Sequence, residues 1–231
     1  MKDKIAEYRK ELNQCFDELD PAVLERIVIA MLGRGRTIFI IGNGGSASTA
    51  SHMAIDLTKG TQVEGGHRLR VISLTDNVAA LTAWANDSSY NDVFTEQLKV
   101  LAKRDDILIA ISVSGHSENV IEAVSWANKN DVGTIGFIGN DGGELKTLGD
   151  ADVTVTSRNF GVVEDFHLSL GHILSQFIRK HIEGGEHWKQ ASLSPAPAGT
   201  SGNTLSSTSW TDQRQILNLC NVTLKADKTS R

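Results

Sequence analysis

The stretch that decides the fold is residues 37–46, TIFIIGNGGS, in which five strand-forming residues run directly into a glycine-rich turn. Each of the first five is β-branched or aromatic, which is typical of a strand buried on both faces of a sheet. A helix-length segment, 48–57, follows the turn. A buried strand, a tight turn and a helix in this order indicate the start of an α/β unit with a parallel sheet.

The same alternation of strand and helix recurs along the chain. Four further strand-like runs lie at 69–74, 107–111, 134–138 and 153–155. Helix-length segments lie at 77–85, 92–102, 118–128 and 162–182. The sequence therefore predicts an α/β fold with a doubly wound, parallel five-stranded sheet flanked by helices. In such folds ligands bind beyond the carboxyl ends of the strands.

Two helices are expected ahead of the first strand, and a tail is expected at the other end. Apolar residues recur every three or four positions over 5–19, and Asp20-Pro21 is typical of a helix N-cap followed by proline at the first helical position. Residues 185–231 are rich in Ser and Thr and carry few large aliphatic side chains. We therefore expect one domain over 1–184 and a poorly ordered tail over 185–231.

Composition narrows the classes of function. Lys plus Arg number 23 and Asp plus Glu 28, and the resulting net charge of −5 argues against a nucleic-acid coat or a polybasic membrane binder. No apolar run is long enough to span a membrane, and the N-terminus has no signal-peptide core. Cys15 and Cys220 are far apart and form no disulfide or zinc motif, so we expect a reducing, cytoplasmic compartment. From the charge and the apolar runs we expect no membrane partner and no direct nucleic-acid partner.

Two of the predicted strands end in loops suited to a phosphate group. The first is followed by Asn43-Gly44-Gly45, where glycine allows close backbone approach and a helix N-terminus comes next. The third is followed by 112–117, SVSGHS, which sets three hydroxyls at another helix N-terminus. Each loop alone could be a tight turn or a helix cap, but two of them at neighbouring strand ends favour a phosphate monoester.

Histidine and carboxylate side chains gather on two of the predicted helices. His52 and Asp56 are four residues apart and share a helix face. On the long helix, Glu164 and His172 lie two turns apart on roughly the same side, whereas His167 points elsewhere. Such groups could hold a divalent metal such as zinc, or serve as acid and base. Spacing alone does not select these four over nearby histidines and carboxylates.

Five blocks of sequence, taken together, resemble the sugar-isomerase (SIS) family and, within it, the phosphoheptose isomerases. They are GNGGSASTASHMAIDL, LTAWANDSSYNDVF, DILIAISVSGHSENV, GFIGNDGGEL and VEDFHLSLGHIL, and the resemblance covers about residues 1–184. It implies a flavodoxin-like SIS fold and an aldose–ketose isomerase that converts sedoheptulose 7-phosphate to D-glycero-D-manno-heptose 7-phosphate through an enediol. It also implies one zinc ion per subunit, a homotetramer and a place in heptose or lipopolysaccharide biosynthesis.

The resemblance also implies roles for individual positions. Substrate contacts would be Asn43, Gly44, Gly45, Asn86, Asp87, Ser112, Val113, Ser114 and Ser117, and the metal ligands would be His52, Asp56, Glu164 and His172. Asp56 or Glu164 would be the base and His172 the acid. Asp56 stands where the family has Glu, Glu164 where it has Gln, and Val113 where the serine loop has Thr.

Two alternatives stay open. One is a non-catalytic phosphosugar-binding or replication-initiator-associating regulator, a relative that keeps the scaffold but lacks the catalytic Glu and the terminal His. The presence of His52, of a carboxylate at Asp56 and of His172 argues against it. The other is an isomerase for a different phosphosugar, because Asp reaches one methylene less far than Glu and a misplacement of about 1 Å costs on the order of 100-fold in rate.

Overall fold

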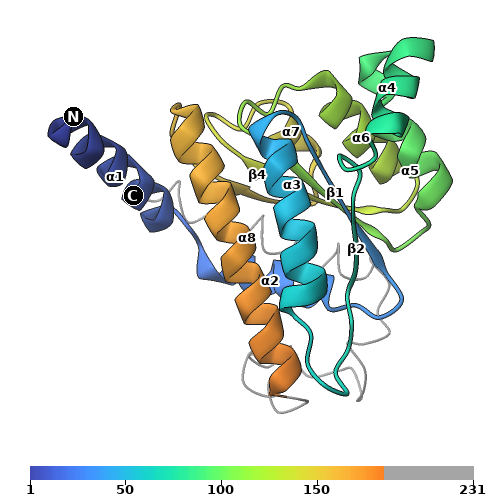
Figure 1. Cartoon of the computed structure of the whole chain (residues 1–231), viewed down its shortest axis with the longest axis horizontal. Helices are drawn as coiled ribbons and strands as arrows, with labels where there is room; N and C mark the ends of the chain where they lie inside the picture. The colour runs from blue at the N-terminus through green and yellow to red at the C-terminus, as the bar shows by residue number, and fades with distance from the viewer. Residues whose placement is uncertain (185–231) are drawn as a thin grey trace, which may run out of the picture.

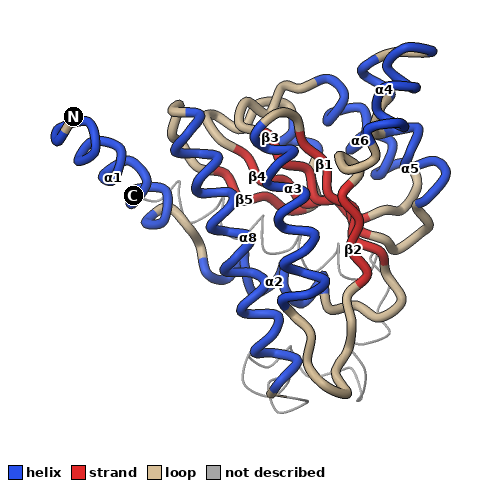
Figure 2. The backbone as a smooth tube through the Cα atoms, in the orientation of Figure 1, coloured by secondary structure: helices blue, strands red, loops and turns tan. Residues whose placement is uncertain are grey.

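The computed structural model describes residues 1–184, so the tail predicted over 185–231 lies outside the described residues. Five parallel strands form one sheet (Figure 2): β1 Thr37–Gly42, β2 Arg70–Ser73, β3 Ile107–Ser112, β4 Gly133–Ile138 and β5 Ala151–Thr154. Their order, β2-β1-β3-β4-β5, confirms the flavodoxin-like, doubly wound fold. The winding reverses between β1 and β3, so the carboxyl ends of these two strands border the ligand crevice.

Helices cover both faces of this sheet (Figure 1). They are α1 Lys2–Asp17, α2 Pro21–Met31, α3 Gly45–Ile55, α4 Val78–Asp87, α5 Thr95–Leu101, α6 Glu118–Lys129, α7 Leu145–Leu148 and α8 Phe160–Glu183. A π-helical turn, η1 Asp56–Gly60, continues α3, and a 3-10 turn, η2 Tyr90–Asp92, follows α4. None of the helices within residues 1–184 is long and apolar enough to cross a bilayer.

The central strands separate two apolar cores. Ile38 and Ile40 of β1 pack with residues of α2, α3 and α8, whereas Phe39 and Ile41 pack with residues of α5 and α6. Every residue of β1, β3 and β4 is buried, as the continuous aliphatic runs predicted. Each fully buried large apolar side chain contributes about 1.5–3 kcal/mol, so the loops after β1 and β3 start from firmly held strand ends.

The boundaries of several elements differ from the sequence prediction. α3 begins at Gly45 instead of residue 48, because the glycine-rich turn itself enters the helix. α4 continues to Asp87 and so includes the whole Asn86–Asp87 pair. α7 was not predicted, since four residues are too few to show a helical period. The predicted N-cap is present, with Ala22 N–H donating to Oδ1 of Asp20 at 2.9 Å.

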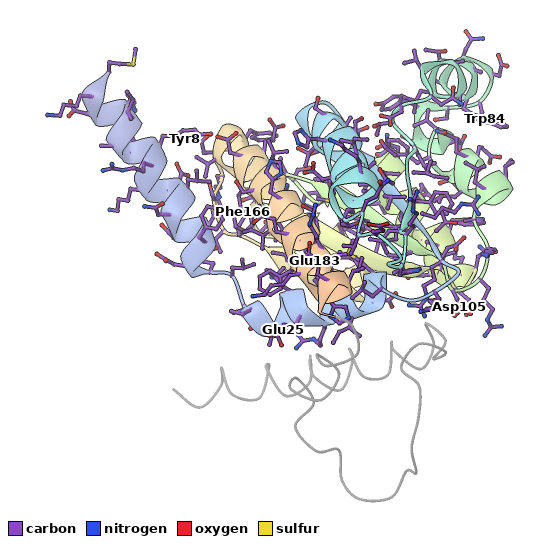
Figure 3. All side chains as sticks on the ribbon, turned by 60° about the horizontal axis from the view of Figure 1, so that its bottom comes forward. Tyr8, Glu25, Trp84, Asp105, Phe166 and Glu183 are labelled. Atoms are coloured by element: carbon purple, nitrogen blue, oxygen red, sulfur yellow. The ribbon has the colours of Figure 1, made fainter. Side chains whose placement is uncertain are left out.

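Helix α1 projects beyond the body of the domain (Figures 1 and 3) and is attached to it both by apolar packing, with Phe16 edge to face on Phe166 of α8, and by polar contacts with α8 and the segment before it. Oη of Tyr8 donates to Oδ2 of Asp165 at 2.6 Å, and Oγ1 of Thr156 donates to Oε1 of Glu18 at 2.7 Å. Burial and the bond to Asp165 raise the pKa of Tyr8 to about 12. The phenol therefore stays a hydrogen-bond donor at every pH at which the protein would function.

Candidate functional site

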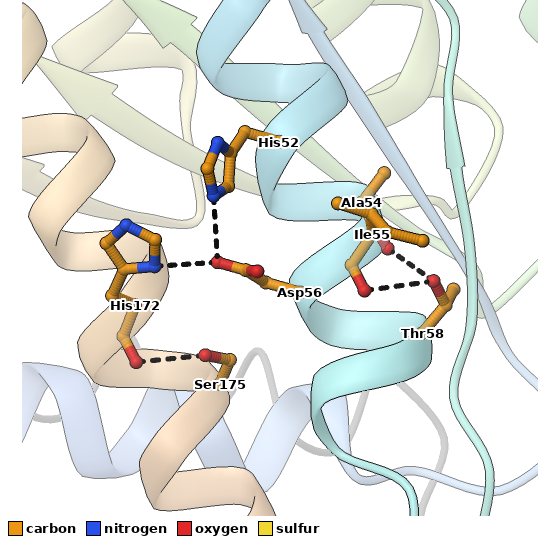
Figure 4. A network of polar contacts seen from close by, with 7 residues as sticks. All are labelled: His52, Ala54, Ile55, Asp56, Thr58, His172 and Ser175. Atoms are coloured by element: carbon orange, nitrogen blue, oxygen red, sulfur yellow. Dashed lines mark hydrogen bonds and ion pairs between the residues drawn. The ribbon is translucent and has the colours of Figure 1, made fainter.

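Two histidines and one carboxylate meet between α3 and α8 (Figure 4). His52 lies in the last turns of α3, Asp56 is the first residue of the π-helical turn, and His172 faces them from α8. Oδ2 of Asp56 is 2.7 Å from Nδ1 of His172 and 3.6 Å from Nε2 of His52. One ligand atom from each residue lies within 4.8 Å of the other two, so the structure brings these three predicted site residues together.

This His–Asp cluster (His52, Asp56, His172) has a donor set that fits a divalent cation. Oδ2 of Asp56 is buried and accepts no hydrogen bond, so its short contact with His172 lacks hydrogen-bond geometry. A cation between the carboxylate and the imidazoles would satisfy such an atom, and nitrogen and oxygen ligands suit zinc. The side chains of His52 and His172 are 47% and 43% exposed, which leaves the cluster open to a ligand.

Glu164, the fourth predicted ligand, is not part of this three-residue cluster. Its carboxylate lies against Gly45, the first residue of α3, where a Cβ would collide with it. α3 and α8 run in the same direction (Figure 1), and Glu164 precedes His172 by eight residues, about 12 Å of helix. The carboxylate therefore faces the N-terminus of α3, which has no side-chain cap and carries free N–H groups.

His167, which spacing alone could not separate from the other candidates, is a core residue. Its side chain is fully buried and lies near the rings of Phe137 and Phe166. Burial lowers the pKa of His167 to about 4, because the charged imidazolium would lose its hydration. Asp165 accepts the hydrogen bond from Tyr8, and neither Asp165 nor His167 belongs to the His–Asp cluster.

The end of β3 and the loop after it place hydroxyls and backbone donors at the start of α6, although Ser112, the last residue of β3, is only 4% exposed. Oγ of Ser112 accepts from Gly115 N–H at 3.0 Å, and Oγ of Ser114 accepts from His116 N–H at 3.2 Å. Gly115 has a φ of +68° and packs so closely on a neighbouring turn that a Cβ would collide with it. Ser117 precedes α6 without a side-chain cap bond, so its hydroxyl and the first N–H groups of α6 can face an anion.

Three other predicted contact residues differ in how they can reach a ligand. The side chain of Val113 is only 6% exposed and packs in the core under α8, so this position has only its backbone to offer. Asn86 and Asp87 are exposed at the end of α4, with Nδ2 of Asn86 donating to Oδ1 of Asp87 at 2.7 Å. α4 lies on the far side of the molecule from α8, so this pair is not brought to the His–Asp cluster within one chain (Figure 1).

Two residues that the sequence analysis did not single out connect the loops. Asn119, on the first turn of α6, exchanges hydrogen bonds of 2.8 and 3.0 Å with the side-chain amide of Asn43. Oη of Tyr90 donates to Oδ1 of Asn43 at 3.0 Å. The signals lay in two of the quoted blocks, since Asn119 follows the serine loop and Tyr90 follows the Asn86–Asp87 pair. No local spacing pairs these three residues, so sequence reasoning missed them.

Comparison with known proteins gives one family. The model of the SIS domain matches residues 3–139. A phosphoheptose isomerase from a Nitratiruptor species is 37% identical over 177 residues, which are 76% of this chain and 94% of the relative. A phosphoheptose isomerase from Helicobacter pylori is 36% identical over 183 residues, which are 78% of this chain and 95% of the relative.

Solved structures agree with this match. The phosphoheptose isomerase from Francisella tularensis superposes with a TM-score of 0.72 at 29% identity, covering 78% of this chain and 98% of that one. The phosphoheptose isomerase from Neisseria gonorrhoeae gives 0.71 at 29% identity, covering 78% and 99%. The sugar isomerase domain of an RpiR transcription factor from Sphaerobacter thermophilus, at 0.55 and 18% identity, shares the fold alone.

Proposed function

The chain belongs to the SIS domain family and, within it, to the phosphoheptose isomerases, and from this premise we propose its reaction. It is an isomerase of phosphosugars, and the substrate we propose is sedoheptulose 7-phosphate, converted to D-glycero-D-manno-heptose 7-phosphate in heptose or lipopolysaccharide biosynthesis. The observation that carries the proposal is the 2.7 Å contact of a carboxylate, Asp56, with an imidazole, His172, on the open surface between α3 and α8.

These two groups suit the chemistry of aldose–ketose isomerisation. The reaction moves one proton between C1 and C2 and a second proton between their oxygens, so it needs a base and an acid side by side. The Asp56 carboxylate takes the carbon-bound proton, and the His172 imidazole exchanges the proton at the oxygens. Glu164 is the alternative base that the resemblance implies, although its carboxylate lies beside the Asn43-Gly44-Gly45 loop, about 12 Å along α8 from His172.

The phosphate end of the substrate is assigned to the serine loop. Hydroxyls of Ser112, Ser114 and Ser117 and the first N–H groups of α6 are donors that hold a phosphate without lysine or arginine. This binding far from the reacting carbons positions the substrate and contributes to the rate. The net charge of −5 is therefore compatible with an anionic substrate.

We further propose that the His–Asp cluster holds one zinc ion per subunit; Glu164, the fourth ligand that the resemblance implies, lies at Gly45 in this structure and would have to move to reach it. When bound there, zinc supplies a Lewis acid that polarises the sugar carbonyl. The support is the buried oxygen of Asp56 that accepts no hydrogen bond between two imidazoles. We also propose a reducing, cytoplasmic compartment, which the buried free thiol of Cys15 suits.

A homotetramer is proposed on two observations. α4 contains seven apolar residues in ten, yet none of its residues is buried in the chain, and Val78 is 66% exposed. Leu81, Trp84 and Ala85 pack partly against the core, and the apolar surface that α4 still exposes indicates a covering partner. Along α3, Gly45 and Asp56 are eleven residues apart, roughly 16 Å, which exceeds the length of one phosphosugar. A second copy next to the site would place its own Asn43-Gly44-Gly45 loop beside the His–Asp cluster of the first copy, so that one substrate could contact both. Light scattering after gel filtration tests this, and a monomer would contradict it.

The experiment that tests the reaction uses the full chain with sedoheptulose 7-phosphate, with and without added zinc, and follows the aldose by NMR. We expect turnover that depends on zinc and falls by at least about 100-fold in Asp56→Asn and in His172→Gln, since a general acid or base contributes about 100- to 10,000-fold. The matched control is His67→Gln, because His67 lies in the loop before β2 and is not a member of the His–Asp cluster. Absence of turnover in both conditions would refute the proposal, and metal analysis without stoichiometric zinc would refute the zinc site.

A further inference from the structure

The side chain of Asn43 is held from two sides by residues that belong to other elements. Oδ1 of Asn43 accepts from Nδ2 of Asn119 and from Oη of Tyr90, each at 3.0 Å. Nδ2 of Asn43 donates to Oδ1 of Asn119 at 2.8 Å. The three residues come from the loop after β1, the first turn of α6 and the 3-10 turn η2, so the contacts join three segments at the carboxyl edge of the sheet.

Counting donors and acceptors shows what Asn43 has left for a ligand. An amide oxygen has two lone pairs, and both lone pairs of Oδ1 are used by Asn119 and Tyr90. An amide nitrogen has two hydrogens, and one of them is used by Asn119. The half-buried Asn43 therefore has one free N–H and no free acceptor. Its side chain can donate to an oxygen of the substrate and cannot accept from one.

We propose that Asn119 and Tyr90 are positioning residues that hold the Asn43 amide as a hydrogen-bond donor toward an oxygen of the sugar substrate. The inference rests on the proposed function for the contact between Asn43 and substrate, and adds two residues to which no role has been assigned. In the proposed tetramer the Asn43 loop of one copy would face the reacting carbons at the His–Asp cluster of another, and a donor held in advance toward an oxygen that gains negative charge during enediol formation stabilises the transition state more than a freely rotating one.

The two positioning residues differ in burial, which decides how each is tested. Asn119 is only 2% exposed, so its replacement would leave a buried amide partner unpaired and lower stability. Tyr90 is 56% exposed, so removal of its hydroxyl in Tyr90→Phe takes away one hydrogen bond and little packing. Asn91 offers a matched control, since its Nδ2 donates to Oε2 of Glu118 at 2.8 Å and ties the same turn to α6 without contacting Asn43.

The first arm of the experiment is a double-mutant cycle in sedoheptulose 7-phosphate turnover. We expect Tyr90→Phe to lower kcat about 3- to 10-fold with KM changed less than about twofold, the loss of one hydrogen bond felt in the transition state. Asn91→Ala should leave kcat within about twofold. In an Asn43→Ala background, Tyr90→Phe should have no further effect, because its target is absent. An equal loss in both backgrounds would overturn the proposal, and so would an equal loss in Asn91→Ala.

The second arm does not depend on activity. In protein labelled with ¹⁵N-asparagine, the side-chain amide signals of Asn43 should shift in Tyr90→Phe and stay in place in Asn91→Ala. They should shift again when sedoheptulose 7-phosphate is added to the wild type. An Asn43 signal that is unmoved by Tyr90→Phe overturns the inference whatever the activity. Absence of turnover with the expected Tyr90-dependent shift refutes the proposed function and leaves the positioning contact supported.

Discussion

The substitution Asp56→Glu, which restores the residue of the family pattern, should damage this protein. Oδ2 of Asp56 already lies 2.7 Å from Nδ1 of His172, so the shorter side chain reaches its partner in full. Glutamate would extend the carboxylate by one carbon–carbon bond, about 1.5 Å. An oxygen carried straight forward by that length would overlap the imidazole, so the longer side chain must bend away. We expect a misplacement of at least about 1 Å and a fall in kcat/KM on the order of 100-fold, equal to about 2.7 kcal/mol of transition-state stabilisation.

The assay is initial-rate conversion of sedoheptulose 7-phosphate at a fixed zinc concentration, with the melting temperature measured in parallel to verify folding. Asp17→Glu is the control, because it makes the same chemical change on the exposed end of α1. We expect Asp17→Glu to match the wild type within about twofold, as surface substitutions do. An Asp56→Glu variant as active as the wild type, or more active, would contradict the argument that the aspartate already reaches its partner in full.

Three further predictions concern residues around this site. Glu164→Gln should keep kcat within about fivefold if Asp56 is the base, whereas a loss of 100-fold or more would make Glu164 the base. Gly45→Ala should lower the free energy of unfolding in urea by about 1–3 kcal/mol, because the new Cβ collides with the Glu164 carboxylate, and adding Glu164→Ala should restore most of it; no loss would contradict the close approach. The folded-state pKa of His167, about 4, lies below its unfolded value of 6.5, so the native state takes up this proton less readily than the unfolded state does. Its stabilising contribution is therefore complete above about pH 6.5 and is lost as pH falls toward 4, by about 3 kcal/mol in all. His167→Leu should therefore flatten the pH dependence of the unfolding free energy between pH 6.5 and 5, and an unchanged slope would contradict this account. The control is His116→Asn, because the side chain of His116 is exposed.

The fold was predictable because the interactions that determine it leave local traces. Strands buried on both faces appear as continuous aliphatic runs, and all five predicted runs are strands of the sheet. The sequence shows strands alternating with helices and short connections between them. Since such crossovers are almost always right-handed, few strand orders remain possible. The four-residue α7 and the π-helical turn at Asp56–Gly60 were not predicted, because neither is long enough to show a period.

The site was predictable only where the two partners lie on one helix or match a family motif. The pair of His52 and Asp56 follows from i, i+4 spacing, and the structure places His172 next to it from a helix more than 100 residues later. The contact between Asn43 and Asn119 joins a loop and the first turn of α6, 76 residues apart, so no local pattern contains it. His167 and His172 lie on the same helix and differ in the direction in which they point from it. The burial of His167, which identifies it as a core residue, becomes visible only in the structure.

Two helix N-termini open toward the same edge of the sheet, and the structure distinguishes them by charge. The N-terminus of α3 faces the carboxylate of Glu164, which supplies negative charge there and repels a second anion. The first turn of α6 carries one carboxylate, that of Glu118, which accepts from Nδ2 of Asn91 on η2 at 2.8 Å, and Ser117 stands before the helix with its hydroxyl uncommitted to a cap. A phosphate dianion would therefore be more stable at α6 than at α3. With the phosphate fixed at α6, the Asn43 amide, held through Asn119 on the first turn of that helix, lies at the same edge of the sheet and has one N–H to donate to an oxygen of the sugar.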